Sequence, residues 1–347
     1  MNGCPCLARP EDAEELLRVM ESGKPAGAVS LLITRRPDPY ASYMAEPGEA
    51  RVYAARANGR ITCTCAMLTR DLYIGGEKKK AAYLCGLKKD EGARTAGFGP
   101  SLFRDLAASG ADLWFLSIVK GNDRAQKLLK KGKRLLSLEA LCAYRTFLVK
   151  PKKMKARPSL PFRRATASDA PALLEFIRRE GSKKELFPVP DKLFSFPGLS
   201  CGDFRILFKD GRIAAAAAFW DRSAQKQYIP LKYGLPLRAL GALSRFAGRS
   251  ALPEAGRVLN YPFLSFFLAE NDDRETASLF LDALSDDARG RYERFIIGVP
   301  EGHFAFEKLK KMTKISFSTE LYAVSFPFAG VESAPVTREV FPECALL

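Results

Sequence analysis

Alternating apolar and polar residues flank two glycine-containing dipeptides in this chain. VYAARANGRITCTCAML (Val52–Leu68) is centred on Asn58-Gly59, and FRILFKDGRIAAAAAFW (Phe204–Trp220) is centred on Asp210-Gly211. Asn-Gly and Asp-Gly are strong signals for two-residue hairpin turns, because both positions of such a turn need positive φ. The pattern therefore predicts two β-hairpins, one in each half of the chain.

The surrounding pattern repeats as well. Helix-like segments with acidic starts precede each hairpin, at 8–22 and 163–180, and a buried strand, a short turn and a basic helix follow at 113–132 and 294–312. Strand-like residues close each half, at 144–150 and 319–326. The order helix, hairpin, strand, helix, strand, helix, strand thus occurs twice, which predicts a duplicated α/β unit.

A proline-rich basic segment, PKKMKARPSLPFRR (Pro151–Arg164), separates the two units and is typical of a linker. We predict an α/β fold of two tandem domains, each a mixed, mostly antiparallel sheet flanked by helices. Their expected bounds are 1–150 and 165–328, with the linker at 151–164 and a C-terminal tail at 329–347. Disorder is expected only at the ends of the chain.

Composition limits the class of protein. Apolar runs such as Ile213–Trp220 fall well short of the roughly 20 residues that span a bilayer, and the first residues lack a basic region followed by an apolar one. We therefore expect a cytoplasmic protein whose eight cysteines stay reduced. Two C-x-C pairs (4, 6, 63, 65) could supply four thiolates, but this is not the usual C-x2-C spacing, so no metal is expected.

The formal net charge of +16 favours binding to an anionic partner, such as a phosphorylated cofactor, nucleic acid or a membrane surface. The lysine clusters at 78–80, 127–134 and 150–157 lack the interleaved aromatic residues of a single-strand binding surface. Nucleic acid is therefore disfavoured, and solvated helix faces account for most of the lysines.

One glycine-rich stretch has the context of a phosphate site. AAYLCGL (Ala81–Leu87) is an apolar strand, RTAGFG (Arg94–Gly99) is a glycine loop, and Pro100 fits the first turn of the helix that follows. Strand, loop and helix N-terminus are in the order that lets backbone N–H groups bind an anion. The spacing is neither that of a P-loop nor that of a dinucleotide-binding fingerprint.

The hexapeptide matches [QR]-x-x-G-x-[GA], the pyrophosphate loop of the GNAT superfamily of acyl-CoA-dependent N-acyltransferases, and residues 7–150 resemble that family. The resemblance implies acetyl-CoA, or another acyl-CoA, as co-substrate and no metal. It implies pantetheine contacts from Leu87, Lys89 and Asn122. For the pyrophosphate it implies the loop residues Arg94, Thr95, Ala96, Gly97, Phe98 and Gly99, and for the 3′-phosphate Lys127, Lys130 and Lys131 are candidates.

The catalytic acid and base of that family are not in their usual places. Leu129 stands where a tyrosine acid is common, and 81–87 contains no glutamate. Tyr144 and Tyr83 are our candidates for the catalytic groups instead. The alternative is that these aromatic residues of predicted strands only pack in the core. We interpret His303, the single histidine, as lying in a polar turn at a helix terminus.

The second half passes from strand to helix at 264–284 without a glycine loop, so it resembles a degenerate partner domain, and one acyl-CoA per chain is expected. The leading hypothesis is acyl transfer to a small-molecule or peptide amine that enters between the halves. The alternatives are a non-catalytic acyl-CoA sensor or scaffold, and a binder of nucleic acid or an anionic surface. The polar segment Trp220–Gln227 lines the cleft or forms an exposed turn.

Overall fold

The computed structural model describes residues 6–23, 29–93, 98, 100–122, 125, 135–154, 159–191, 196–234 and 253–347. The first half contributes β1 (Cys6–Leu7), α1 (Ala13–Glu21), β2 (Val29–Thr34), α2 (Pro39–Met44), β3 (Glu49–Ala57), β4 (Arg60–Ile74), β5 (Glu77–Lys89), α3 (Pro100–Ala107), β6 (Leu113–Val119) and β7 (Ser137–Val149). The predicted order of elements is confirmed here, except that the basic helix between β6 and β7 lies largely outside the described residues.

The second half contributes β8 (Phe162–Arg164), α5 (Ala170–Gly181), β9 (Phe204–Lys209), β10 (Arg212–Trp220), β11 (Gln227–Tyr233), β12 (Phe263–Ala269), α7 (Arg274–Ala288), β13 (Phe295–Pro300), α8 (Phe306–Met312) and β14 (Ser316–Ser325). Short 3-10 turns lie at Pro10–Asp12, Ala167–Asp169, Cys201–Asp203, Glu270–Asp272, Pro327–Ala329 and Cys344–Leu346. Both predicted hairpins are confirmed: Asn58-Gly59 joins β3 to β4, Asp210-Gly211 joins β9 to β10, and all four residues have positive φ.

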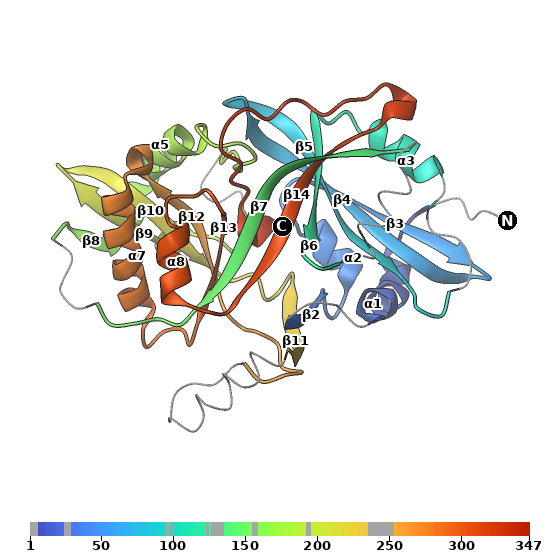
Figure 1. The fold of residues 1–347 in the computed structure, drawn as a ribbon, viewed down its shortest axis with the longest axis horizontal. Helices are drawn as coiled ribbons and strands as arrows, with labels where there is room; N and C mark the ends of the chain where they lie inside the picture. The colour runs from blue at the N-terminus through green and yellow to red at the C-terminus, as the bar shows by residue number, and fades with distance from the viewer. Residues whose placement is uncertain are drawn as a thin grey trace.

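One continuous sheet runs through both halves in the order β1-β3-β4-β5-β6-β14-β7-β13-β12-β10-β9-β8. The closing strands are exchanged: β14 of the second half pairs with β6, whereas β7 of the first half pairs with β13. The two exchanged strands lie antiparallel to each other in the middle of the molecule (Figure 1). Each half therefore completes its sheet with a strand from the other.

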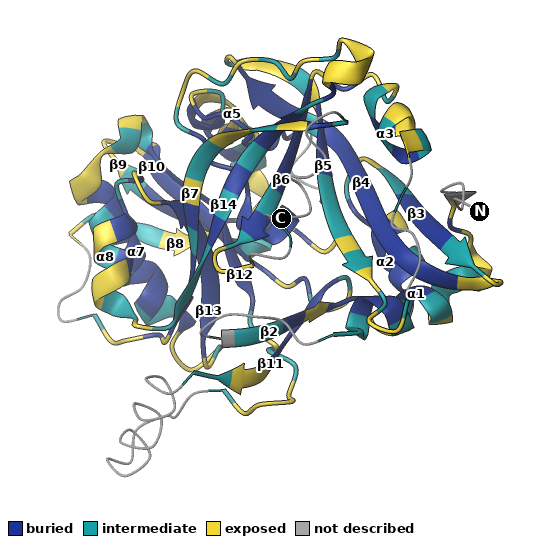
Figure 2. Ribbon diagram, turned by 45° about the vertical axis from the view of Figure 1, so that its right-hand side comes forward, coloured by how far each residue is buried: buried dark blue, intermediate teal, exposed yellow. Residues whose placement is uncertain are grey.

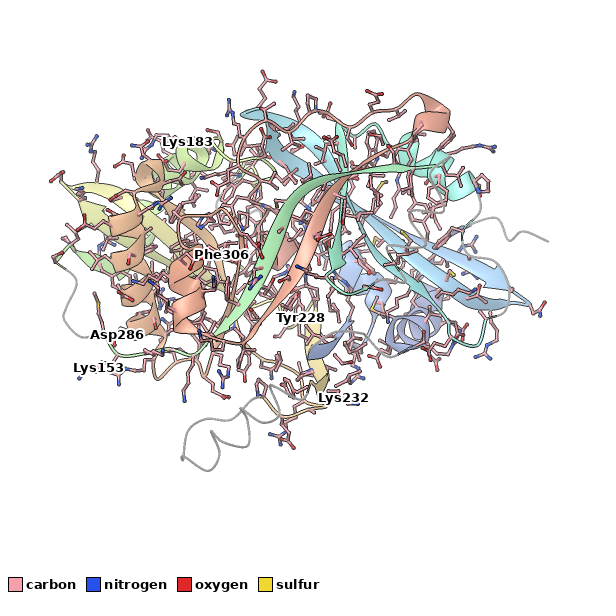
Figure 3. All side chains as sticks on the ribbon, viewed as in Figure 1. Lys153, Lys183, Tyr228, Lys232, Asp286 and Phe306 are labelled. Atoms are coloured by element: carbon pink, nitrogen blue, oxygen red, sulfur yellow. The ribbon has the colours of Figure 1, made fainter. Side chains whose placement is uncertain are left out.

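A second, two-stranded ribbon also joins the halves. β2 and β11 pair antiparallel, with Thr34 opposite Gln227 at one end and Val29 opposite Tyr233 at the other. Figure 3 shows Tyr228 near the centre of the molecule and Lys232 at its edge, in keeping with a buried and an exposed side chain at the two ends of β11. The ribbon brings the segment after β10 against α2.

The sheet supplies most of the core, and its strands are dark along much of their length in Figure 2. In the first half, Leu16 of α1 and Tyr43 of α2 pack with Ala66 and Leu68 of β4 on one face. Leu102 of α3 packs with Cys65 and Met67 on the other face. Because side chains alternate along a strand, β4 has two distinct faces, here called the α1/α2 face and the α3 face.

The expectation of disorder at the C-terminal end is wrong. Val340, Phe341 and Ala345 are buried, and the Phe341 amide donates to the carbonyl of Glu185 at 2.8 Å. Figure 1 marks the C-terminus in the middle of the molecule, and the turn Cys344–Leu346 contacts β12 and β13. Its apolar residues are held by burial and its backbone by hydrogen bonds, both of which oppose disorder.

No helix in the described part of the chain is long and apolar enough to cross a membrane.

Candidate active site

The parallel pair β5 and β6 opens at one end. Their ladder runs from Ala81 opposite Leu113 to Leu84 opposite Leu116 and extends no further among the described residues. β5 nevertheless continues to Lys89, paired with β4 on its other edge. The last part of β5 therefore presents backbone groups toward β6 without a ladder partner, and such groups are available to a ligand.

A β-bulge marks the point where the pair opens. Cys85 lies opposite Ala66 and Lys88 lies opposite Thr64, so two residues of β5 face one residue of β4. Gly86, in the bulge, has φ +63° and its carbonyl accepts a hydrogen bond from the Thr64 hydroxyl at 3.0 Å. A Cβ atom at residue 86 would collide with the Tyr43 hydroxyl, so this position requires glycine.

The predicted cofactor residues that the structure describes lie around this opening. Leu87 and Lys89 are exposed at the end of β5, and Asn122 follows β6, where its side-chain oxygen accepts from the Ala125 amide at 3.2 Å. Phe98 packs partly buried against the core of the α3 face. Arg94, Thr95, Ala96, Gly97, Gly99 and the lysines 127, 130 and 131 lie outside the described residues.

The two predicted tyrosines lie in different surroundings. The Tyr83 hydroxyl is 2.6 Å from the Ser117 hydroxyl, across β5 and β6 at the end of their ladder. Tyr144 is 1% exposed and donates to the carbonyl of Pro342 at 3.1 Å, beneath the C-terminal segment. Burial raises the pKa of both phenols. Tyr83 is the one placed at the opening.

A buried ionic cluster, which the sequence analysis missed, lies on the α1/α2 face. One carboxylate oxygen of Glu46 lies 2.8 Å from Nη1 of Arg35, and the other lies 2.6 Å from Nη2 of Arg222. The charges of Arg70 and Lys226 also act on Glu46. Burial works to raise the pKa of Glu46, but these cations hold it at about 2. We call Arg35, Glu46, Arg70, Arg222 and Lys226 the cation cluster.

The segment Trp220–Gln227 lies between the halves and is not an exposed turn. Trp220, Arg222 and Lys226 are buried, and the Ser42 hydroxyl donates to the carbonyl of Gln225. Lys226 donates to the backbone oxygen of Leu347, and burial lowers its pKa to about 8. No sequence signal marks Arg70, because Thr69 and Asp71 beside it in β4 are polar too.

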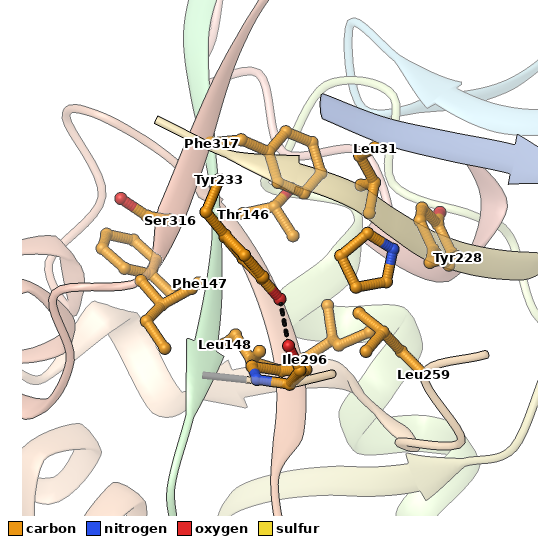
Figure 4. Close-up of a pocket in the computed structure, with 13 residues that line it drawn as sticks. Leu31, Thr146, Phe147, Leu148, Tyr228, Tyr233, Leu259, Ile296, Ser316 and Phe317 are labelled. Atoms are coloured by element: carbon orange, nitrogen blue, oxygen red, sulfur yellow. Dashed lines mark hydrogen bonds between the residues drawn. The ribbon is translucent and has the colours of Figure 1, made fainter. Parts of the chain in front are cut away.

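An apolar pocket adjoins the cluster through Tyr228. Its lining comes from the β2–β11 ribbon, β7, β13 and β14, including Leu31, Phe147 and Ile296 (Figure 4). The Tyr233 hydroxyl donates to the carbonyl of Pro253 at 2.8 Å at its wall. The pocket therefore offers apolar contact beside the charged groups.

The second half differs from the first at the two places that correspond to the opening and the loop, which are the bulge of β12 and the N-terminus of α7. The N-terminus of α7 is capped by the Asp273 carboxylate, which accepts from the amides of Glu275 and Thr276. At the bulge of β12, where Phe266 has φ +53°, the Glu343 carboxylate accepts from the Phe266 amide at 2.7 Å. The chain's own carboxylates thus occupy donors that an anionic ligand would need.

His303 is not in a polar turn, contrary to our interpretation of the sequence. It precedes α8, as expected, but it is 3% exposed, and its ring lies 3.9 Å from that of Phe304 and 4.6 Å from that of Phe341. Nδ1 accepts from the Ala305 amide, and Nε2 has no hydrogen-bond partner among the described residues. Burial, aided by the charge of Lys184, lowers the pKa of His303 to about 3.

This depressed pKa predicts acid sensitivity. The unfolded chain binds a proton at His303 below pH ~6.5, whereas the folded chain does so only near pH 3, so stability is lost as the pH falls between these values. We expect His303 to contribute a loss of about 2–3 kcal/mol between pH 7 and pH 4.5. His303→Gln removes this loss, measured as the difference between wild-type and variant urea denaturation. Parallel pH profiles for the two proteins would contradict it.

No model of a protein family matches the sequence, and no curated protein matches it. Solved structures do. The chain is similar to Saccharomyces cerevisiae N-myristoyltransferase with bound myristoyl-CoA, with a TM-score of 0.56 and 11% identity over 96% of this chain and 88% of that one. The chain has the fold of the GNAT superfamily.

Two further structures with this GNAT fold match at a TM-score of 0.50 and 10% identity. A probable N-acyltransferase from Enterococcus faecalis matches over 94% of this chain and 73% of its own. A GCN5-related N-acetyltransferase from Kribbella flavida matches over 94% of this chain and 72% of its own. Because identity is so low, the matches show the fold, and chemistry has to be argued from the site.

Proposed function

We propose that this chain is an N-acyltransferase that binds an acyl-CoA at the opening between β5 and β6 and transfers the acyl group to an amine. The observation that carries the proposal is the opening itself. The parallel ladder ends at Leu84, the Gly86 bulge follows, and the predicted glycine loop and α3 come next in the chain. Acyltransferase folds among the similar structures support it.

The residues present fit such a ligand. The unpaired edge of β5 beyond Leu84 suits an extended amide-containing arm, and the sequence of residues 94–99, predicted to form a glycine loop, suits a pyrophosphate. A bound acyl-CoA supplies a thioester whose carbonyl carbon is the electrophile. Either acetyl-CoA or a longer acyl-CoA is consistent with the proposal, since one similar structure holds myristoyl-CoA.

The chain's own groups would then position the thioester and transfer protons. The bulge lies at the opening, where a backbone N–H of Cys85 or Gly86 can stabilise a developing oxyanion. Tyr83 is protonated because burial raises the pKa of its phenol, and with Ser117 it forms a hydroxyl pair at the opening. The pair can pass a proton to the leaving thiolate and take up the proton that the attacking amine loses, so that the hydroxyl is restored. The amine enters on the α1/α2 face, to which Tyr83 points.

One acyl-CoA per chain is proposed, as expected from the missing glycine loop. Asp273 caps α7 and Glu343 accepts from the Phe266 amide, so the corresponding donors of the second half are taken. We also propose that the second half is a degenerate copy of the first, because its strands repeat the same antiparallel and parallel pairings.

Binding is tested by calorimetric titration with acetyl-CoA and with myristoyl-CoA. Gly97→Glu places a negative side chain in the predicted phosphate loop and is expected to weaken binding of either ligand at least about 100-fold. The matched control is Gly302→Glu, where an added Cβ meets nothing within 4 Å and the residue is exposed. Wild-type protein that binds neither ligand at high micromolar concentration would refute the proposal.

A non-catalytic acyl-CoA sensor is the second candidate. It is favoured by the lack of any carboxylate in 81–87 and by Leu129 at the position where the family places its acid. Thioester consumption with a panel of amines separates the two functions. Turnover establishes the enzyme, whereas tight binding without turnover supports the sensor.

A further inference from the structure

The cation cluster contains more positively charged side chains than negatively charged ones. Its four cations are 1–8% exposed, and Glu46 is the one carboxylate among its members. Removing a charged group from water costs several kcal/mol unless an opposite charge and hydrogen bonds replace the water. Arg35 and Arg222 share the single charge of Glu46, and Arg70 and Lys226 form no ion pair with a side-chain carboxylate of the described residues.

Two of the arginines also have hydrogen-bond donors with no acceptor. Nε, Nη1 and Nη2 of Arg70, and Nε and Nη1 of Arg222, are buried without a partner among the described residues. Buried polar groups in proteins almost always have partners, and exceptions point to a role in function or to a missing ligand. A planar guanidinium with free donors has the geometry to bind a carboxylate or a phosphate bidentately.

Register places Arg70 beside the proposed reaction centre. Arg70 lies opposite Ala81 of β5, so it shares a sheet face with Tyr83, two residues further along β5. The charges of Arg70, Arg35 and Lys226 all act on the thiol of Cys85, at the edge of the bulge. An anion held by Arg70 would therefore lie close to the opening between β5 and β6.

This anion is not a phosphate of the acyl-CoA. The predicted pyrophosphate loop leads into α3, and α3 packs on the α3 face with Cys65 and Met67. Arg70 is on the opposite face, because it alternates in phase with Leu68 and Leu72, which pack with Tyr43 of α2. The α1/α2 face is the one from which we propose that the amine enters.

We propose that Arg70 and Arg222 bind an oxyanion group of the acceptor, so that the acceptor is a small amine bearing a carboxylate or a phosphate. The inference rests on the proposed function in that it assigns the anion to the acceptor of an acyl transfer. The arginines would hold the acceptor by its anionic end and leave its amine free to approach the bulge. Glu46 keeps Arg35 and Arg222 in place through its two ion pairs.

Anion binding is measured first, without acyl-CoA, by thermal denaturation in sodium acetate and in sodium phosphate at constant ionic strength set with chloride. The wild-type melting temperature is expected to rise with either anion. Arg70→Met removes the rise, and Arg212→Met, at an exposed position of β10, keeps it. If Arg70→Met does not fold, Arg70→Lys serves the same test, because it keeps the charge and loses the guanidinium fork.

Acceptor preference is measured next as thioester consumption with matched pairs: glycine against glycinamide, and 2-aminoethyl phosphate against 2-aminoethanol. We expect the anionic member of one pair to have a kcat/KM at least about tenfold higher, with the difference lost in Arg70→Met. The pair that shows the difference identifies carboxylate or phosphate.

The two measurements separate the inference from the proposed function. An Arg70-dependent rise in melting temperature without turnover of any amine supports the anion site and counts against the enzyme. Equal turnover of neutral and anionic amines, unchanged in Arg70→Met, overturns the anionic acceptor and leaves the enzyme standing. Absence of any specific stabilisation by either anion also overturns it.

Discussion

Glu46→Gln is expected to lower the free energy of unfolding by about 3–5 kcal/mol, because it removes one partner from buried ion pairs. Glu46 is 6% exposed and pairs with Arg35 and Arg222 through separate oxygens. Glutamine keeps the shape of the side chain but leaves four buried cations without a counter-charge inside the cluster. Urea denaturation followed by circular dichroism measures the change.

Glu307→Gln is the matched control. Glu307 pairs with Lys310 at 3.2 Å, but its side chain is 68% exposed, and exposed pairs contribute at most about 1 kcal/mol. A loss in Glu46→Gln no larger than in Glu307→Gln would show that the buried cluster does not depend on its carboxylate. Phosphate or acetate should stabilise Glu46→Gln more than wild type if the cluster binds anions.

Gly86→Ala is expected to abolish most acyl transfer and to lower the free energy of unfolding by about 2–4 kcal/mol, through both backbone strain and overpacking. The new methyl group would be added at φ +63° and would collide with the Tyr43 hydroxyl. Relief of that contact must move the buried Tyr43 ring, β5 or α2. Because the bulge lies where β5 and β6 separate, even a shift of about 1 Å is expected to reduce the rate roughly 100-fold.

Two variants separate the causes. Gly59→Ala also adds a methyl at positive φ, but nothing lies within 4 Å of its Cβ, so only a strain of about 1–2 kcal/mol is expected there. Tyr43→Phe in the Gly86→Ala background removes the colliding hydroxyl and should restore part of the stability and activity. Equal effects of Gly86→Ala and Gly59→Ala would show that contact with Tyr43 is unimportant.

Strand exchange ties the halves together. β7 precedes the proline-rich segment, yet its ladder partners β13 and β14 both come from the second half. A fragment ending near residue 150 would carry β7 without either partner and would leave β6 without β14. Experiments on function therefore need the whole chain.

Local chemistry determined much of what could be predicted. Asn58-Gly59 and Asp210-Gly211 specify hairpins because both residues adopt positive φ readily, and the alternating and helical periods specify the elements between them. The motif RTAGFG lies between a strand and a helix and resembles the pyrophosphate loop of the GNAT superfamily. The GNAT fold that this resemblance implied is the fold observed.

Only tertiary structure decided the rest. Arg35 and Glu46 flank α2, but Arg70 and Arg222 are distant from them in the sequence, and no local pattern predicts that α2, β4 and the segment after β10 meet. The exchange of β7 and β14 was equally hidden, since nothing in the sequence of either strand prevents pairing within its own half. His303 shows the same limit: we expected a polar turn at a helix terminus, but besides its sequence neighbour Phe304 its ring packs with Phe267 of β12 and Phe341 of the C-terminal segment. Sequence determined the helices and strands, because these depend on neighbouring residues. The three-dimensional packing set the buried charges, because these depend on which distant elements share a face of the sheet.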